Sequence, residues 1–368
     1  MLARFEVENF KGFEKKIVFD LSSTSKYEFN QGLVQNGIVK NGVIFGKNGS
    51  GKTNLGIAIF DIVTNLTNNK TSTYGANEPF VNFNSNSNNV SFLYEFVFDE
   101  DRVTYSYQKD SLQNLINEDL MINNDVLLHY DYNEKNGYSK LKGTESLNTD
   151  LQNKRISFVK YVFYNSILSQ SRYNDLFAQM MDFVDKMLMF SSLKQTFYFG
   201  YTQGGEDYQD YIVRNNLLNS FELFMNEMGF NYKLSSITAN NRGIILIDYK
   251  KGKASMLDVN STGANNLMHL FYWLHRAGDA SFIYMDEFDA FYHYELSNAV
   301  IRESIKKEIG QVLFTSHNTN LMNNNMFRPD CLFIIRDNGI SSLSKLTNKE
   351  LREAHNLEKM YKGGAFND

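Results

Sequence analysis

The sequence predicts an α/β fold in which a mixed β-sheet carries a glycine-rich loop, with an antiparallel β-subdomain beside it. Three patterns indicate this class. An apolar stretch at 43–45 runs into a glycine-rich loop and then into a helical pattern. Residues 90–132 contain short alternating runs separated by turns, as β-hairpins do. From residue 264 onwards, apolar strands alternate with helical patterns, which is typical of a parallel sheet.

The first part of the chain is expected to consist mainly of strands. Residues 3–10 alternate as a half-buried strand does, 9–15 supply a turn, and 16–21 form a second strand. The strand at 43–45 leads into a helix from Lys52 to Leu66 with one apolar face. Residues 65–89 are rich in Asn, Ser and Thr and are predicted as a surface loop. Strands are expected at 90–98, 103–108, 115–122 and 125–132, before a turn-rich linker at 135–150.

The middle of the chain carries apolar residues at helical spacing, in the stretches 156–168, 175–190 and 217–230. We interpret these Met- and Phe-rich stripes as core packing of an inserted helical subdomain. The predicted division is therefore an N-terminal lobe at 1–145, a helical insert at 146–235 and a C-terminal lobe at 236–368.

The last part returns to strands and helices in alternation. Strands are expected at 243–250, 281–286, 311–316 and 331–336, and helices at 264–277, 294–308 and 348–361. The single cysteine, Cys331, opens the apolar run CLFII and is predicted to be a core residue.

The glycine-rich loop has the spacing of a phosphate-binding loop, G-x-x-x-x-G-K-[ST]. Glycines let successive backbone N–H groups turn towards a phosphate, and the following helix adds its positive N-terminal end. The Lys52 ammonium is expected to reach the β- and γ-phosphates, and the Thr53 hydroxyl to ligate Mg²⁺. An ordinary glycine turn is the alternative. The predicted nucleotide-binding residues are Gly46, Lys47, Asn48, Gly49, Ser50, Gly51, Lys52, Thr53 and Asn54.

Two carboxylates follow a buried strand at the end of 282–285. Asp286 is placed to hold the shell of a Mg²⁺ ion, and Glu287 to accept a proton from an attacking water. His317 follows the next predicted strand and is expected to contact the γ-phosphate, although a capping or surface role is the simpler reading of a lone histidine. A further small-residue segment, Ser261, Thr262 and Gly263, precedes a helix, where it forms either an anion site or a plain N-cap.

Composition limits the class of protein. The net charge of −5 argues against a constitutively basic nucleic-acid coat, though not against a local basic groove. One cysteine permits no internal disulfide, which suits a reducing compartment. No run approaches the roughly 18 apolar residues of a membrane helix, so a cytoplasmic protein is expected.

The set GKNGSGKTNL, STGANNL, YMDEFDAFYH and TSHN resembles the ABC-type ATPase heads of the SMC/RecF class, and in particular the AAA-type ATP/GTP-phosphatases of phage-defence operons. The tail LREAHNLEKMYKGGAF is similar to that of AbiL-type abortive-infection ATPases, which are encoded beside a RloB-like putative nuclease. The short S-x-G segment stands where transporters carry LSGGQ, and it lacks the second glycine and the glutamine.

The resemblance implies ATP and Mg²⁺ as cofactors and a composite site. The P-loop of one subunit would be closed by Ser261–Gly263 of a second copy, so a homodimer is expected. Asp289 and His293 would belong to the family's run DEFDAFYH, which combines the Walker B carboxylates with the D-loop that follows them. A glutamine that ligates the metal is also implied, with Gln152, Gln170 and Gln179 as candidates and Gln170 slightly preferred.

The expected function is thus a sensor or regulatory ATPase that controls a separate effector, such as a RloB-like nuclease. The alternative is a RecF-like DNA-repair ATPase, with a basic groove built from Lys160, Lys186 and Lys194 or from the C-terminal lysines 345, 349, 359 and 362 with Arg352. A transporter ATPase subunit is disfavoured by the long β-meander and the altered signature.

Overall fold

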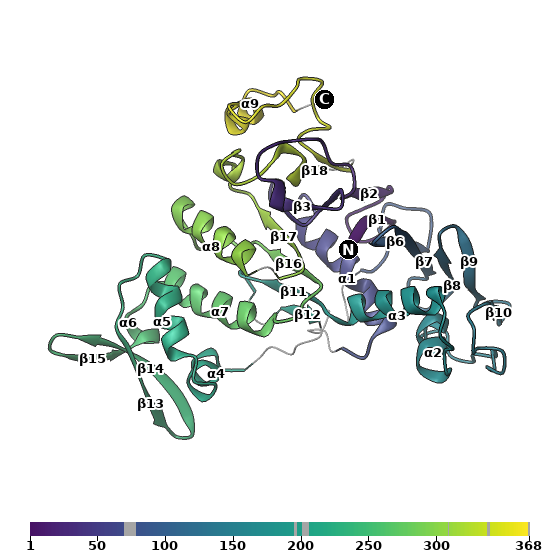
Figure 1. The fold of residues 1–368 in the computed structure, drawn as a ribbon, viewed down its shortest axis with the longest axis horizontal. Coiled ribbons are helices and arrows are strands. Elements are labelled where there is room, and N and C mark those ends of the chain that lie inside the picture. The colour runs from purple at the N-terminus through teal and green to yellow at the C-terminus, as the bar shows by residue number, and fades with distance from the viewer. Residues whose placement is uncertain (70–78, 195–196, 201–205, 308, 337–338, 367–368) are drawn as a thin grey trace.

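A computed structural model describes residues 1–69, 79–194, 197–200, 206–307, 309–336 and 339–366. Within these ranges the chain forms two seven-stranded sheets, a three-stranded sheet and the small ribbon of β3 (Val34–Gln35) and β4 (Ile38–Val39). Figure 1 shows the three larger sheets distributed across the molecule, with the three-stranded sheet projecting at one end.

The central sheet carries the glycine-rich loop. Its strand order is β12-β11-β16-β17-β5-β18-β19. The five strands from β11 to β18 in this order are parallel, and β12 and β19 pair antiparallel at the two edges. The predicted parallel sheet is therefore confirmed. The bounds are β5 (Asn41–Phe45), β11 (Met187–Ser191), β12 (Tyr198–Gly200), β16 (Phe282–Asp286), β17 (Gln311–Ser316), β18 (Leu332–Arg336) and β19 (Gly339–Ser342).

The second sheet is antiparallel throughout, with the order β10-β9-β8-β7-β6-β1-β2. It confirms the predicted meander and adds one strand to it, because the segment expected to be a linker begins with β10. Gly137 permits this pairing, since a Cβ there would lie 2.4 Å from the His129 carbonyl oxygen. The bounds are β1 (Leu2–Glu8), β2 (Ile17–Asp20), β6 (Val90–Phe98), β7 (Asp101–Lys109), β8 (Leu115–Ile122), β9 (Asp125–Asp131) and β10 (Asn136–Ser139).

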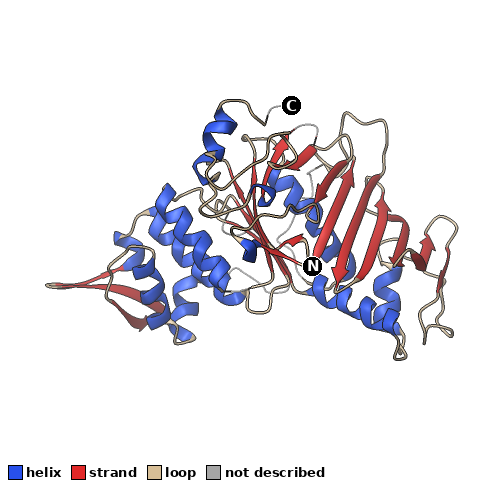
Figure 2. Cartoon of the chain, turned by 45° about the horizontal axis from the view of Figure 1, so that its top comes forward, coloured by secondary structure: helices blue, strands red, loops and turns tan. Residues whose placement is uncertain are grey.

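Helix α1 (Lys52–Leu66) lies between the two large sheets (Figure 2). It contacts β11 and β16 of the central sheet, while the Tyr94 hydroxyl of the antiparallel sheet donates to the Ala58 carbonyl at 2.9 Å. The fully buried Gln311 side chain joins the sheets a second time, because it bonds both backbone groups of Leu2 and the Val39 carbonyl. Helix α1 is therefore held between two sheets that are also joined directly to each other.

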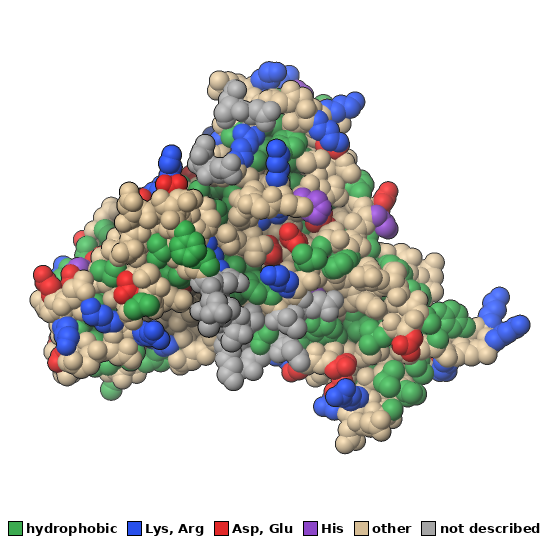
Figure 3. All heavy atoms as spheres, turned by 180° about the vertical axis from the view of Figure 1, so that it is seen from behind, with side chains coloured by type: hydrophobic (Ala, Val, Ile, Leu, Met, Phe, Trp, Pro, Cys, Tyr) green, Lys and Arg blue, Asp and Glu red, His purple; other side chains and the backbone are tan. Residues whose placement is uncertain are grey.

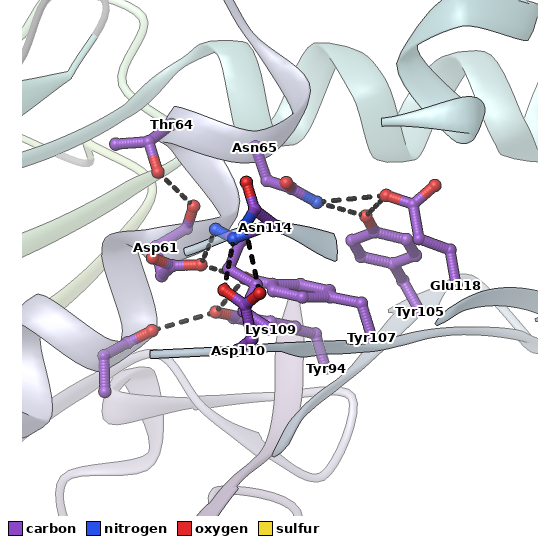
Figure 4. A network of polar contacts seen from close by, with 11 residues as sticks. Asp61, Thr64, Asn65, Tyr94, Tyr105, Tyr107, Lys109, Asp110, Asn114 and Glu118 are labelled. Atoms are coloured by element: carbon purple, nitrogen blue, oxygen red, sulfur yellow. Dashed lines mark hydrogen bonds and ion pairs between the residues drawn. The ribbon is translucent and has the colours of Figure 1, made fainter. Parts of the chain in front are cut away.

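A buried polar network fixes α1 to the antiparallel sheet (Figure 4). The Asp61 carboxylate accepts hydrogen bonds from the Lys109 ammonium at 2.5 Å and the Tyr107 hydroxyl at 2.7 Å. Beside it, Glu118 accepts from the Tyr105 hydroxyl at 2.9 Å and from the backbone N–H of Phe158 at 2.7 Å, the first residue of α2. Burial raises the pKa of the Glu118 carboxyl.

The stretch expected to be one inserted helical subdomain, 146–235, is divided between three places. Helices α2 (Phe158–Asn165) and α3 (Arg172–Asp185) pack against α1, and β11 is a strand of the central sheet. The helix predicted over 175–190 therefore ends at Asp185. The reason is that Met187, Leu188 and Phe190 are all buried, and periodicity alone does not distinguish a fully buried strand from a buried helix.

The rest of the insert forms the projecting end of the molecule. Helices α4 (Tyr208–Arg214) and α5 (Leu218–Glu227) pack against helix α7 (Thr262–Arg276). The three-stranded sheet, which we call the arm, comprises β13 (Leu234–Ala239), β14 (Arg242–Tyr249) and β15 (Gly252–Ser255) in antiparallel order. Helix α6 (Met256–Val259) connects the arm to α7. The arm extends beyond the body in both views (Figures 1 and 2).

The C-terminal segment contains less helix than expected. The helix predicted over 348–361 is reduced to α9 (Leu357–Lys362), because the Asn324 side chain takes up the carbonyls of Arg352, Glu353 and His355. Helix α8 (Tyr294–Lys306) forms as expected, while residue 308 lies outside the described ranges, as do 70–78 of the predicted surface loop. Cys331 is buried, as predicted. Among the helices of the described ranges, none is both long enough and apolar enough to span a membrane.

Candidate nucleotide-binding site

The glycine-rich loop, Gly46–Gly51, connects β5 to α1 as the sequence predicts. Gly51 has a positive φ of 96°, which disfavours any side chain, and a Cβ there would lie 2.7 Å from the Phe13 ring. A Cβ on Gly46 would lie 2.3 Å from the Ser50 Oγ. Both positions therefore require glycine, because other side chains of the protein occupy the space that a Cβ would need.

Lys52 is held inside this loop. Its Nζ donates to the carbonyls of Gly46 at 2.8 Å and Lys47 at 3.3 Å, and the side chain is only 4% exposed. Burial lowers the pKa of the ammonium, an effect opposed by the nearby carboxylates of Glu287 and Asp286. In the described part of the chain Lys52 makes no ion pair, so its charge remains available to an anion.

Tyr284 of the central sheet holds the backbone of the same lysine. This buried residue lies in the middle of β16, and its hydroxyl donates to the Lys52 carbonyl at 2.7 Å. A Cβ on Gly56 would lie 2.6 Å from the Tyr284 ring. The glycine in the first turns of α1 thus lets the helix approach the strand closely enough for this hydrogen bond. The sequence patterns did not indicate this contact.

Asp286 lies at the end of β16 beside the first turn of α1. Its carboxylate accepts from the Thr53 hydroxyl at 2.9 Å and from the Thr315 hydroxyl at 3.0 Å. Burial raises the pKa of the Asp286 carboxyl to about 6, although the two hydroxyls and Lys52 oppose the rise. The structure thus brings together Thr53 and Asp286, the two oxygen donors predicted for the metal.

The ends of β16 and β17 are tied together around the second carboxylate. Glu287 has φ of 47°, unusual for a residue with a side chain, and its N–H donates to the Thr315 Oγ1 at 2.7 Å. Asp289 accepts from the Ser316 hydroxyl at 2.6 Å, and burial raises the pKa of the Asp289 carboxyl. His317 follows directly and is exposed. Its contact with a γ-phosphate stays a prediction.

The segment Ser261–Gly263 forms the N-terminus of α7. The Ser261 hydroxyl accepts from the Ala264 N–H at 3.3 Å and so caps the helix, and Ser261 and Thr262 are both exposed. A Cβ on Gly263 would lie 2.9 Å from the Phe291 carbonyl oxygen. Across the described residues, no hydrogen bond or ion pair joins this segment to the P-loop of the same chain. His293 is the N-cap of α8, accepting from the Leu296 N–H.

Gln170 is not brought to the site. It precedes α3, whose first residue, Arg172, pairs with Asp101 at the β6–β7 turn. The glycine-rich loop instead contacts Phe13, near the opposite end of these strands. The strand that does lie beside the carboxylates is β11, since Ser191 is opposite Asp286 and the Ser192 N–H donates to the Asp286 carbonyl at 3.1 Å. The next glutamine in the chain, Gln195, lies outside the described residues.

The donor set fits a Mg²⁺-bound nucleoside triphosphate. Thr53 and Asp286 offer the oxygen ligands that Mg²⁺ prefers, and the Ser50 Oγ is buried without a hydrogen-bond partner. A hollow beside the loop is lined by 12–15, Gly49–Gly51, Asn54 and Arg336 among others, and adjoins the phosphate-binding turn. When bound, the ion would neutralise phosphate charge, while Lys52 and the loop N–H groups hold the phosphates.

A P-loop after β5, a buried lysine and two carboxylates at the end of β16, two strands away in the same parallel sheet, define a P-loop nucleotide-binding fold. Residues 43–323 match the family described as AAA domain, putative AbiEii toxin, type IV toxin–antitoxin system. The chain belongs to this family.

Solved structures give matches of low identity. The SMC head domain from Thermotoga maritima matches at 14% identity with a TM-score of 0.43, covering 90% of this chain and 94% of its own. The SMC head bound to the C-terminal winged-helix domain of ScpA matches at 16% identity with a TM-score of 0.45, covering 94% of this chain and 99% of its own. The SMC head with an extended coiled coil, bound to the C-terminal domain of ScpA derived from Pyrococcus furiosus, matches at 15% identity with a TM-score of 0.44. The match covers 94% of this chain and 97% of that one. No curated protein sequence gives a match.

Proposed function

We propose that this chain binds and hydrolyses ATP as a homodimer with two composite sites. The observation that carries the proposal is the separation of two half-sites. Lys52, Thr53 and Asp286 gather at the carboxyl ends of the central strands. The exposed Ser261 and Thr262 lie at the start of α7, and within the described part of the chain they make no hydrogen bond to the P-loop. In a dimer with twofold symmetry, each P-loop would face the other subunit's α7.

In this proposal the carboxylates have separate roles. Asp286 and Thr53 hold the Mg²⁺ shell, and Glu287 accepts the proton of the water that attacks the γ-phosphate. His317 contacts the γ-phosphate, and Asp289 holds the end of β17 through Ser316. ATP binding closes the dimer and hydrolysis reopens it, so the protein works as a nucleotide-driven switch.

The test compares Lys52→Ala and Glu287→Gln with wild type. Lys52→Ala should abolish both phosphate release and ATP-dependent dimerisation, because the phosphates lose their buried cation. Glu287→Gln should abolish release but accumulate as an ATP-bound dimer in light scattering. The matched control is Gln170→Ala, an exposed residue away from the site, which should leave the rate unchanged. A Glu287→Gln protein that binds ATP and remains a monomer would contradict the composite site.

We further propose that the switch acts in the cytoplasm as the regulator of a separate effector in an abortive response to phage, with a RloB-like nuclease as the partner. The support is the family description, which names a type IV toxin–antitoxin system. Co-expression with a RloB-like protein encoded beside it should reduce phage plating, and Lys52→Ala should cancel the reduction. Equal protection by the Lys52→Ala pair would contradict regulation through ATP.

A further inference from the structure

The arm is a basic element in an acidic chain. Its strands and turns, together with the residues immediately beside them (233–258), carry five basic and two acidic side chains, a net charge of +3, although the whole chain carries −5. The basic residues are Lys233, Arg242, Lys250, Lys251 and Lys253, and the acidic ones are Asp248 and Asp258. Such a reversal of local charge attracts an anionic partner to this end of the molecule.

Two of the three arm cations that make no ion pair within the described ranges lie at the tip of the β14–β15 ribbon, and the third, Arg242, lies at the β13–β14 turn. Lys253 pairs with Asp248 at 3.2 Å, and Lys233 pairs with Glu222 at 3.0 Å. Lys250 and Lys251, which form the turn, are exposed and make no ion pair or hydrogen bond within the described ranges. Figure 3 shows Lys and Arg side chains at the end of a narrow projection, with hydrophobic side chains behind them.

The shape of the tip favours one kind of partner. A stable protein interface buries about 800 Å² on each side, which a two-stranded ribbon that projects from the body does not offer. Lysine contacts to phosphate need no such area, and the major groove of a duplex admits a two-stranded ribbon. Tyr249, 54% exposed and adjacent to Lys250, adds an aromatic ring beside the charges. We propose that the tip of the arm binds the phosphate backbone of a nucleic acid.

The position of the arm places this contact next to Ser261–Gly263. Strand β15 ends at Ser255, α6 follows at once, and α7 begins at Thr262. The Tyr232 hydroxyl, at the base of β13, donates to the Asn260 side chain at 2.9 Å. A nucleic acid bound to the arm would therefore act on the segment that leads into α7. The contact with the nucleic acid does not itself depend on ATP hydrolysis.

The experiment measures anisotropy of labelled duplex DNA, single-stranded DNA and RNA with nucleotide-free protein. The double variant Lys250→Glu/Lys251→Glu should weaken binding at low salt by about tenfold or more and reduce the salt slope by about 2. The control is Lys26→Glu/Lys142→Glu, which changes the same total charge at two exposed lysines outside the arm and outside both candidate grooves, and should bind as wild type. Circular dichroism confirms that both variants fold.

Three outcomes would overturn the proposal. One is no binding of the wild type to any of the three probes at low salt. Another is equal weakening in both double variants, which would indicate only net charge. The third is competition by poly-L-glutamate as effective as that of unlabelled DNA at equal charge concentration, which would assign the tip to an acidic polypeptide. Because ATP is absent, failure of the ATPase proposal leaves each result interpretable.

Discussion

Burial of Asp286 beside Thr53 raises the pKa of its carboxyl to about 6, well above the value of an unfolded chain. Between about pH 4 and 6 the native state therefore binds more protons than the unfolded state, so stability falls as pH rises through this window. Above about pH 6 the cost of the buried charge is fully present. The metal-free protein is thus destabilised by the residue that we propose as a Mg²⁺ ligand.

Asp286→Asn should accordingly raise the unfolding midpoint of the nucleotide-free protein at pH 7.5, by up to about 3 kcal/mol in free energy, while Mg²⁺-dependent hydrolysis is lost. The difference from wild type should vanish below about pH 4, where Asp286 is protonated in both states. Thermal unfolding of both proteins in the presence of a chelator, at several pH values, measures this difference in stability. Asp182→Asn, at an exposed surface pair, is the control. A less stable Asn variant at pH 7.5 would contradict the assigned cause.

Residues that act within one motif could be predicted from the sequence, since their spacing fixes their positions relative to the backbone. Lys52 and Thr53 lie at the start of α1, and Asp286 and Glu287 at the end of β16, as expected. Contacts between distant segments could not be predicted. No pattern distinguished Gln170 from the other candidate glutamines, Gln152 and Gln179. The hydrogen bond from Tyr284 to the Lys52 carbonyl depends on the packing of α1 on β16.

Helix α1 connects the glycine-rich loop to the antiparallel sheet through the buried pair of Asp61 and Lys109. Both side chains are at most 10% exposed, so each charge depends on its partner. Lys109→Met should cost about 3–5 kcal/mol in urea unfolding, because it leaves the Asp61 carboxylate buried without its cation. Adding Asp61→Asn should recover part of the loss.

The matched control is Lys186→Met, which breaks an exposed i,i+4 pair with Asp182. Its cost should stay within about 0.5 kcal/mol, since water screens such pairs. If the two methionine variants lose the same stability, the network around Asp61 does not anchor α1. A loss for Lys109→Met that the Asp61→Asn change leaves undiminished would show that packing, and not charge, is responsible.

Elements with a clear period were predicted closely, and those decided by tertiary contacts were not. The bounds of α1 agree with the sequence pattern because its apolar face is continuous. Strand β11 was taken for helix because its four apolar residues are buried in the middle of the sheet. The segment before α9 has a helical pattern, but Asn324 competes for its carbonyls.

At the scale of the whole molecule, the motifs at the two ends of the chain were more informative than the patterns in its middle. The motifs at both ends converge on one sheet, so the glycine-rich loop and the carboxylates identify that sheet together. Residues 146–235 contribute to the α1 layer, the central sheet and the base of the arm, and no local pattern indicates such a division. The lysines considered for a basic groove also depend on tertiary contacts, since Lys160 bonds the Thr67 carbonyl and Lys345 pairs with Asp20.

If each site is shared between two copies, two inactive variants should restore activity when mixed. Lys52→Ala removes the P-loop cation, and Thr262→Glu places a negative charge at the exposed first turn of α7, where it suits the helix but repels a phosphate. Each variant alone should be inactive. In an equal mixture half of the dimers are mixed, and each mixed dimer has one intact site, so about a quarter of wild-type activity should return.

Phosphate release after mixing measures this recovery, and energy transfer between copies labelled with donor and acceptor dyes checks the exchange of subunits. A protein whose sites are complete within one chain would show no recovery, because both variants would then carry their defect in every site. Recovery well above about a quarter would indicate assemblies larger than a dimer or unequal exchange. The mixing experiment therefore distinguishes a site closed by a second copy from one in which Ser261–Gly263 serves only as the N-terminal cap of α7.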